Sequence, residues 1–471
     1  MHAPQFPQTE IEESLDAPLP DRAVAEKLAD LVLALRPEGI PAPVRARAEE
    51  LLIDVVGLCV AARQTDYIQA LVAAVDGGGA CTAIGHPSGY SAEDAALING
   101  TATHGEDFDD TFEGGPVHSS AVVIPAVLAA CERFNRDGRA ALAGIVAGIE
   151  ATCRLSMVVP KAIHKSGFHP TSVLGTVGGT LAVARALGLE RQAMVDALGN
   201  SGSLASGIIE YLAEGAWTKR LHPGWAAKSA IAAARIGRAG FLGPRTMLEG
   251  IHGLFHGFAR SLDGNYGVLT DDFGKQWVMQ GITFKPYATG TMNQPYIDCA
   301  LRLRRHGVRP EEVTDILCET AEGYVHRLWE PLASKHRPAN AYAAKFSTPF
   351  NIAVAYLTGE AGLSAFTEEA ARDERILALA SKVRYVVDPN NPYPKAYTGH
   401  VRMTLKDGRV IEERQPHIRG GAHEPLTRAD IEAKFRGNCA HGGWSGERAD
   451  RFLASVPSFF DRPLDLAPLR G

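Results

Sequence analysis

Long runs of small apolar residues at helical spacing dominate the first half of this chain and limit the folds that are open to it. Clear examples are ALAGIVAGIEATCRLSMVV at 141–159 and SVLGTVGGTLAVARALGL at 172–189. Their apolar positions run around the helix and not along one stripe, and their alanines and glycines let neighbouring backbones approach closely. No stretch of this half shows the alternation typical of strands. The pattern predicts a large all-α domain whose helices are buried on most sides.

The composition changes after about residue 281. KVRYVVD at 382–388 and HVRMTLKDGRVIEERQ at 400–415 alternate in polarity, contain β-branched residues and include an Asp-Gly turn, as strands of a hairpin do. Helical patterns lie between them, and a further helix capped by Thr427 follows. The predicted fold is therefore mainly α, with a smaller α+β lid domain. The expected parts are a loose tail at 1–20, the large helical domain at 21–281, the lid at 282–415 and a helical segment at 416–471 that returns to the large domain.

Charge and cysteine usage narrow the class of protein. The net charge of −6 argues against nucleic acid as a partner. The seven cysteines are dispersed without a C-x-x-C pair, which is typical of reduced thiols in a cytoplasmic protein. The N-terminus lacks the basic and apolar regions of a signal peptide. We find no uninterrupted apolar run of membrane-spanning length, and so expect a soluble protein with no membrane partner.

The most unusual stretch is NGTATHGEDFDDTFEGGPVHSS at 99–120, where acidic residues and histidines crowd between two apolar helices. If the helix before it continues, Asp107, Asp110 and Thr111 stand at i, i+3 and i+4 and face the same way. His118 then lies in the tight connection before the next helix, and its ring can reach back toward Asp107 or Thr111. A carboxylate beside an imidazole tunes and orients it, which is the arrangement of a general acid or base.

The residues around this stretch predict how the helices end and begin. Gly114, Gly115 and Pro116 are expected to end the first helix, and Ser119 or Ser120 to cap the second. Two other interpretations of the acidic residues stay open. They can form a solvated face with a cap, or, with His118, hold a metal, although no second cluster of metal ligands accompanies them.

Three further candidates lie outside the central stretch. His169 stands in a turn just ahead of a helix that starts near Ser172, where helix N–H groups favour a bound carboxylate. Lys219 and Arg220 form a basic pair in a predicted loop, and Lys285 lies at the predicted domain boundary. Each alone is more often a structural histidine or a surface cation. Together with the acidic centre they favour a cleft between the domains.

The motifs as a set resemble the MmgE/PrpD family, which includes 2-methylcitrate dehydratase, cis-aconitate decarboxylase and iminodisuccinate epimerase. The matching pieces are NGTATHGEDFDDT with VHSS, GFHPTS, TKRLHPGWAAKS, FKPY and AKFS, in family order over most of the chain. The resemblance implies a homodimer and an active site between a helical domain and a lid, with no metal or organic cofactor. Decarboxylases of the family also carry a tyrosine in the lid. The residues implied to line the site are Asp107, Thr111, His118, His169, Lys219 and Lys285.

The resemblance also implies a small di- or tricarboxylate as substrate. Lys219, Arg220, Lys285 and a protonated His169 are expected to bind its carboxylates, because cations stabilise charge that develops beside a carboxylate. His118, with its tautomer set by Asp107, is expected to move the proton. Family usage favours dehydration of a 2-methylcitrate-like or citrate-like hydroxy acid. The alternatives are decarboxylation of the cis-aconitate type, epimerisation of the iminodisuccinate type, a non-catalytic carboxylate-binding protein and a metal-dependent hydrolase.

Overall fold

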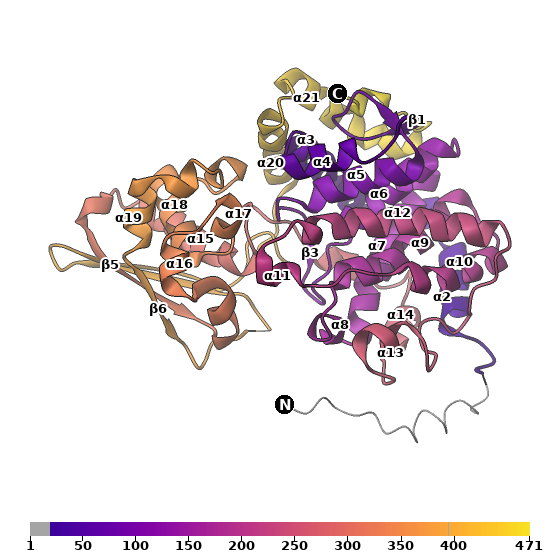
Figure 1. Ribbon diagram of the computed structural model, residues 1–471, viewed down its shortest axis with the longest axis horizontal. Coiled ribbons are helices and arrows are strands. Elements are labelled where there is room, and N and C mark those ends of the chain that lie inside the picture. Colours follow the sequence, from indigo (N-terminus) through magenta and orange to yellow (C-terminus); the bar gives the residue numbers. More distant parts are fainter. Residues whose placement is uncertain (1–18, 394) are drawn as a thin grey trace. The chain divides into compact units, whose positions relative to one another are not determined.

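The computed structural model describes residues 19–393 and 395–471, which form two compact units (Figure 1). Unit 1 runs to Gly105, resumes at 111–281 and ends with 450–471. Unit 2 consists of the short segment 106–110 and of 282–449. The fold is mainly α with a small sheet in unit 2, as predicted. Most of the predicted tail at 1–20 lies outside the described residues.

Unit 1 is built from helices of widely different length (Figure 1). The long ones form where the sequence shows unbroken helical periodicity, and the short ones lie in connections. They are α2 (Val24–Ala34), α3 (Ala42–Ala62), α4 (Asp66–Ala73), α5 (Ala92–His104), α6 (Ser120–Arg133), α7 (Gly138–Val158), α8 (Ala162–Lys165), α9 (Pro170–Leu187), α10 (Arg191–Leu204), α11 (Tyr211–Glu214), α12 (Thr218–Arg238), α13 (Leu254–Ala259) and α14 (Gly267–Thr270).

Small residues let the central helices of unit 1 pack at close range. All residues of α9 except Arg185 are buried, as the all-round apolar pattern predicts. A Cβ added to Gly224 of α12 would lie 2.2 Å from the carbonyl oxygen of Leu97 in α5, and a Cβ added to Gly100 would lie 2.7 Å from Gly224 Cα. Any larger side chain would therefore force these helices apart. The contact fixes the end of α5 beside the start of α12, which matters for the site.

The prediction that this half contains no sheet is wrong in one segment. Strands β1 (Gly77–Thr82) and β2 (Gly89–Tyr90) pair antiparallel in a Gly-rich stretch. Gly79 shows the reason, because a Cβ there would lie 2.1 Å from the carbonyl carbon of Tyr90. Glycine permits a backbone approach that strand propensity does not predict. A further two-residue strand, β3 (Thr111–Phe112), precedes the loop that contains the predicted site.

Helix α7 passes a length and composition test for a membrane span, contrary to the expectation that no run would do so. It has 21 residues, and 94% of its 18-residue apolar window is buried within the protein. Core helices of soluble proteins pass the same test, so α7 is weak evidence for a membrane span.

Unit 2 contains a four-stranded sheet in the order β6-β5-β7-β8 (Figure 1). β5 pairs parallel with β6 and antiparallel with β7, and β7 and β8 form the hairpin that the Asp-Gly turn predicts. Ile316, Cys318 and Thr320 of β5 are buried while their neighbours are more exposed, which gives the alternation expected of a sheet covered on one face. The strands are β4 (Ile282–Thr283), β5 (Val313–Thr320), β6 (Val383–Val387), β7 (Gly399–Leu405) and β8 (Val410–Gln415).

The helices of unit 2 are shorter than those of unit 1, and α15 packs on β7 and β8. The long segment of unit 2 begins at Ile282, where the sequence pattern changes, and the chain returns to unit 1 at Asp450 and not at residue 416. Helix α20 accounts for the difference, because it packs on 363–365 of unit 2 and its Lys434 contacts Phe108. The helices are α15 (Gln294–Arg304), α16 (Leu332–His336), α17 (Ala341–Ala344), α18 (Thr348–Thr358), α19 (Glu374–Ala380) and α20 (Arg428–His441), followed by α21 (Gly446–Ser455), which crosses the boundary.

Candidate active site

Four histidines form a cluster in unit 1. The ring centroids of His104 and His118 are 4.6 Å apart, those of His104 and His169 are 5.6 Å apart, and those of His118 and His169 are 6.5 Å apart. His222 completes the group, with its centroid 5.3 Å from that of His169. Tyr211 packs edge-on against both His169 and His222. We call His104, His118, His169 and His222 the histidine cluster.

Helix ends bring the members of the histidine cluster together. His104 is the last residue of α5, His118 stands two residues before α6, and His169 occupies the N-cap position of α9. His222 lies in the second turn of α12, whose start is held beside the end of α5 by the Gly100–Gly224 contact. The four side chains are far apart in the sequence, so only the packing of these helices makes them neighbours.

His118 is placed by a short loop. The backbone N–H of Phe112 donates to the carbonyl of Val117 at 3.0 Å, so the chain returns beside Thr111. Thr111 Oγ1 then lies 3.5 Å from His118 Nδ1, at the long limit of a hydrogen bond. The backbone N–H of His118 donates to Thr171 Oγ1 in the first turn of α9 at 3.2 Å. The predicted neighbourhood of Thr111 and His118 is therefore present in unit 1.

The helix predicted to connect these residues is shorter than expected. α5 ends at His104, so Asp107, Asp110 and Thr111 do not share a helical face. Asp107 instead has a φ of 54°, in the left-handed region that a helix excludes. The glycines before His118 lie in the loop that follows β3 and do not end a helix. Ser119 occupies the predicted N-cap position of α6, but its side chain makes no capping hydrogen bond.

The electrostatics of the cluster differ from the expectation for His169. Burial, then the charges of His104 and Lys219, hold the pKa of His169 well below its usual range. Burial and the charge of Lys219 lower the pKa of His222 to about 4. Both rings are therefore neutral near neutral pH, and the predicted role of His169 as a protonated carboxylate partner does not hold for the unliganded protein.

The basic pair at the start of α12 divides between two environments. Lys219 and Arg220 lie in the first turn of that helix and not in the predicted loop. Lys219 acts on the pKa values of both His169 and His222, which places its ammonium near the histidine cluster. The Arg220 guanidinium stacks over the Tyr67 ring at 4.4 Å, in a cation–π contact. Lys219 is thus the better placed of the two to meet a ligand at the cluster.

Asp107 belongs to unit 2, where two side chains bind it. The Tyr342 hydroxyl donates to Asp107 Oδ2 at 3.0 Å, and Lys285 Nζ donates to the Asp107 carbonyl at 2.8 Å. Lys285 Nζ also lies 4.0 Å from Asp107 Oδ1. Lys285 is only 1% exposed, so it is a buried cation and not a surface one. These contacts stabilise the unusual backbone of Asp107, of the kind that clusters at functional sites.

Two more lysines hold the segment 106–110 within unit 2. Lys345 Nζ donates to the Glu106 carbonyl at 2.8 Å and forms an ion pair with the Glu106 carboxylate. Lys434 Nζ donates to the Phe108 carbonyl at 2.6 Å and lies over the Phe108 ring. A five-residue segment is thereby anchored at three successive residues. The predicted pairing of Asp107 with His118 joins residues of different units and stays a prediction.

Sequence reasoning assigned no role to five residues that these contacts bring forward. His104 ends α5 and His222 follows the basic pair, and both stand in the motifs that carry the family resemblance. Lys345 stands in the AKFS motif, but its buried contact with Glu106 is a long-range feature with no local signal. No motif in the sequence singles out Tyr211 or Tyr342 from the other tyrosines. The residues missed are His104, Tyr211, His222, Tyr342 and Lys345.

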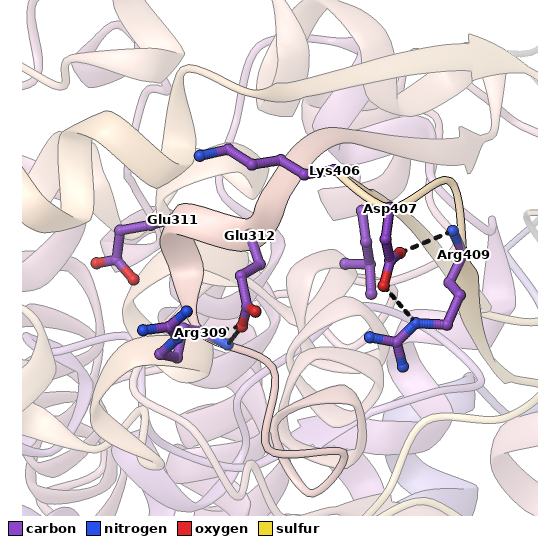
Figure 2. Close-up of a pocket in the computed structure, with 7 residues that line it drawn as sticks. Arg309, Glu311, Glu312, Lys406, Asp407 and Arg409 are labelled. Atoms are coloured by element: carbon purple, nitrogen blue, oxygen red, sulfur yellow. Dashed lines mark hydrogen bonds and ion pairs between the residues drawn. The ribbon is translucent and has the colours of Figure 1, made fainter.

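Unit 2 also contains two pockets, one of which includes Phe108 and Lys434 in its lining. Figure 2 shows one of about 390 Å³, lined by the hairpin turn between β7 and β8 and by Arg309, Glu311 and Glu312. Its charged side chains pair with each other, as Asp407 and Arg409 do at 2.7 Å. The other, of about 550 Å³, is lined by both acidic and basic side chains, including Lys434. Its lining includes one histidine, His441, whereas unit 1 brings four together. We therefore take the histidine cluster of unit 1 and, separately, Asp107 of unit 2 as the candidate functional residues.

Comparison with known proteins agrees with the resemblance noted in the motifs. The MmgE/PrpD N-terminal domain matches residues 26–265, and the MmgE/PrpD C-terminal domain matches residues 287–456. The cis-aconitate decarboxylase of Homo sapiens is 29% identical over 368 residues, which cover 74% of this chain and 72% of that protein. The cis-aconitate decarboxylase-like protein oryM of Aspergillus oryzae is 25% identical and covers 93% of this chain and 95% of its own. The cis-aconitate decarboxylase of Aspergillus terreus is 27% identical, with 92% of each chain covered. The chain therefore belongs to the MmgE/PrpD family of lyases.

Proposed function

We propose that this protein is a lyase that decarboxylates a small unsaturated polycarboxylate of the cis-aconitate type. The observation that carries the proposal is the histidine cluster beside Lys219, which combines groups that transfer protons with a cation that attracts carboxylates. The names of the similar proteins support the choice of substrate. Tyr342, a tyrosine in unit 2 whose hydroxyl meets Asp107, supports the choice of decarboxylation over dehydration.

The chemistry that these residues must assist is demanding. Cleavage of the bond to the leaving carboxyl group releases CO₂ and leaves the electron pair on a substrate carbon. The neighbouring double bond and carboxylate delocalise that pair, and a proton added at carbon completes the reaction. The substrate therefore loses CO₂ and gains one proton. The protein has to hold several negative charges in one pose and deliver a proton to carbon.

We assign the roles as follows. His118 is the proton donor, because it stands in a loop, is half-buried and has Thr111 beside its Nδ1. Lys219 and Lys285 bind substrate carboxylates, and their charges offset the charge that develops on the substrate. His169 serves as a neutral hydrogen-bond donor, as its lowered pKa requires. Asp107, oriented by Tyr342 and Lys285, is the group expected to set the tautomer of His118.

His104, Asp107 and Thr111 stand within eight residues of one another in the sequence. We propose that the motif that contains them contributes several of the groups that act in catalysis.

Dehydration of a 2-methylcitrate-like hydroxy acid is the second candidate, because the same acid and base can remove a proton and protonate a departing hydroxyl. The motifs of the central stretch favour it through family usage alone. It requires a hydroxyl on the substrate and releases water, whereas decarboxylation requires an unsaturated acid and releases CO₂. Epimerisation would instead exchange a proton without net loss of substrate. The three reactions are thus separable by their products.

The deciding experiment is proton NMR of the protein incubated in D₂O with cis-aconitate, trans-aconitate, citrate, 2-methylcitrate and iminodisuccinate. Decarboxylation predicts loss of cis-aconitate, one deuterium at carbon in the product and an equal amount of CO₂. A new vinyl signal from a hydroxy acid without CO₂ would instead establish dehydration. If no compound changes, stabilisation by carboxylates in a thermal shift assay would favour the non-catalytic binding protein.

Treatment with a chelator tests the expectation that the activity needs no metal ion. Imidazole and carboxylate groups are common metal ligands, so this expectation needs its own measurement. We expect full activity after dialysis against EDTA. Activity that is lost on chelation and restored by one divalent ion would support the metal-dependent alternative and contradict the proposed mechanism.

A further inference from the structure

Within the histidine cluster, His169 and His222 make a direct contact between ring nitrogens. Their Nδ1 atoms are 3.1 Å apart, and the two side chains are only 5% and 7% exposed. Two nitrogens at this distance in a buried place need one proton between them, because two lone pairs or two N–H groups would repel. One ring therefore donates from Nδ1 and the other accepts at Nδ1.

The tautomers of the two rings are consequently opposite. The lowered pKa values of His169 and His222 mean that each neutral ring carries a single N–H. The ring that donates from Nδ1 leaves its Nε2 as an acceptor, and the ring that accepts at Nδ1 carries its hydrogen on Nε2. The contact therefore decides which atom His169 can offer to a ligand.

We infer that His222 is a positioning residue that donates from Nδ1 to His169 Nδ1 and so holds the His169 N–H at Nε2. This inference rests on the proposed function, because a carboxylate-binding His169 must present an N–H to the substrate. His169 can present an N–H from Nε2 to the substrate only if it accepts at Nδ1, so His222 must be the donor of the pair.

The surroundings of the pair support a fixed geometry. His169 is held through its backbone, whose N–H donates to the Gly207 carbonyl at 2.8 Å. Gly207 also lies close to His222, since a Cβ added at Gly207 would stand 3.4 Å from His222 Cε1 and 2.7 Å from Ser172 Cβ. Tyr211 packs edge-on against both rings. Among the described residues, the charges of His104, Lys219 and His118 lower the pKa of His169, and the charge of Lys219 also lowers that of His222.

Two variants of His222 separate positioning from a structural role. His222→Leu keeps an apolar side chain of similar size but cannot hydrogen-bond. His222→Asn places an amide group where the imidazole Nδ1 stood, so it can still donate to His169. We expect His222→Leu to lower kcat/KM on the order of tenfold, mainly through KM, as loss of one buried hydrogen bond to a substrate-binding group predicts. We expect His222→Asn to stay within about threefold of the wild type, because its hydrogen bond is retained.

A second readout does not depend on turnover. In protein labelled with ¹⁵N at histidine, NMR of the unliganded wild type should show a ¹⁵N–¹⁵N coupling across the His169–His222 hydrogen bond and opposite tautomers for the two rings. The coupling and the His222 ring signals should be absent from the spectrum of His222→Leu. The same spectra are obtained even if no carboxylate in the panel is a substrate, so failure of the proposed function and failure of this inference are distinguishable.

Three results would overturn the inference. One is a wild-type spectrum in which the two rings have the same tautomer or show no coupling. Another is a wild-type His169 that donates from Nδ1, which would reverse the assigned direction. The last is equal kcat/KM for the Leu and Asn variants at matched unfolding midpoints, because a purely structural His222 would affect both alike.

Discussion

Acidification should weaken unit 1 through its buried histidines, and His222 allows the effect to be calculated. Its pKa is about 4 in the folded protein, because burial and Lys219 disfavour the charged ring, against about 6.5 for an ordinary histidine in the unfolded chain. Between these values the unfolded state binds a proton that the folded state does not, so stability falls as the pH falls. Integrated from pH 7.5 to 5, the difference in proton binding between the unfolded and folded states lowers the free energy of unfolding by about 2 kcal/mol for this one residue. His169 contributes in the same direction.

The measurement is urea unfolding of the wild type and of His222→Leu at several pH values in this window, followed by circular dichroism. The free energy of unfolding of the wild type should fall more steeply than that of the variant, and its extra loss between pH 7.5 and 5 should approach about 2 kcal/mol. His306→Asn, at an exposed position, controls for the effect of substituting a histidine. Parallel curves for the wild type and His222→Leu would refute the argument that His222 is neutral because it is buried beside a cation.

Three other predictions follow from the contacts. His118→Ala should lower kcat at least about 100-fold, as loss of a general acid does, with little change in the unfolding midpoint because the residue stands in a loop; wild-type activity in this variant would remove His118 from the mechanism. Lys285→Ala should raise KM for polycarboxylates more than about tenfold and affect neutral analogues far less; steady-state kinetics without that charge selectivity would contradict the binding role. Glu150→Gln should lower the free energy of unfolding by about 3–5 kcal/mol, because it removes the carboxylate that neutralises a buried cation. That cation is Arg154, which is 4% exposed and whose Nε donates to Glu150 at 2.6 Å. A change below about 1 kcal/mol, measured by urea unfolding, would contradict a structural role for this pair.

The sequence alone determined the elements of this fold that depend on local pattern. Helical periodicity and small residues predicted the buried helices of unit 1, and alternation around an Asp-Gly turn predicted β7 and β8. Such features follow from the 3.6-residue and 2-residue repeats and from turn chemistry, which act between residues close in the chain. The family resemblance also follows from the sequence alone, because it depends on short motifs and on their order along the chain. The pairing of β1 with β2 does not follow from the sequence, because glycine permits a close approach of strands without predicting it.

The partners and protonation states of the candidate site residues depend on tertiary structure. Asp107 was placed on a helical face by spacing, yet Lys285 and Tyr342 hold it in a left-handed backbone conformation that no i, i+3 rule describes. His222 joins His169 only because the start of α12 packs against the ends of other helices. The neutral state of both rings depends on burial and on a nearby lysine, which are long-range properties. Local pattern specifies which helices form, whereas the protonation and partners of the functional side chains depend on which helix ends meet.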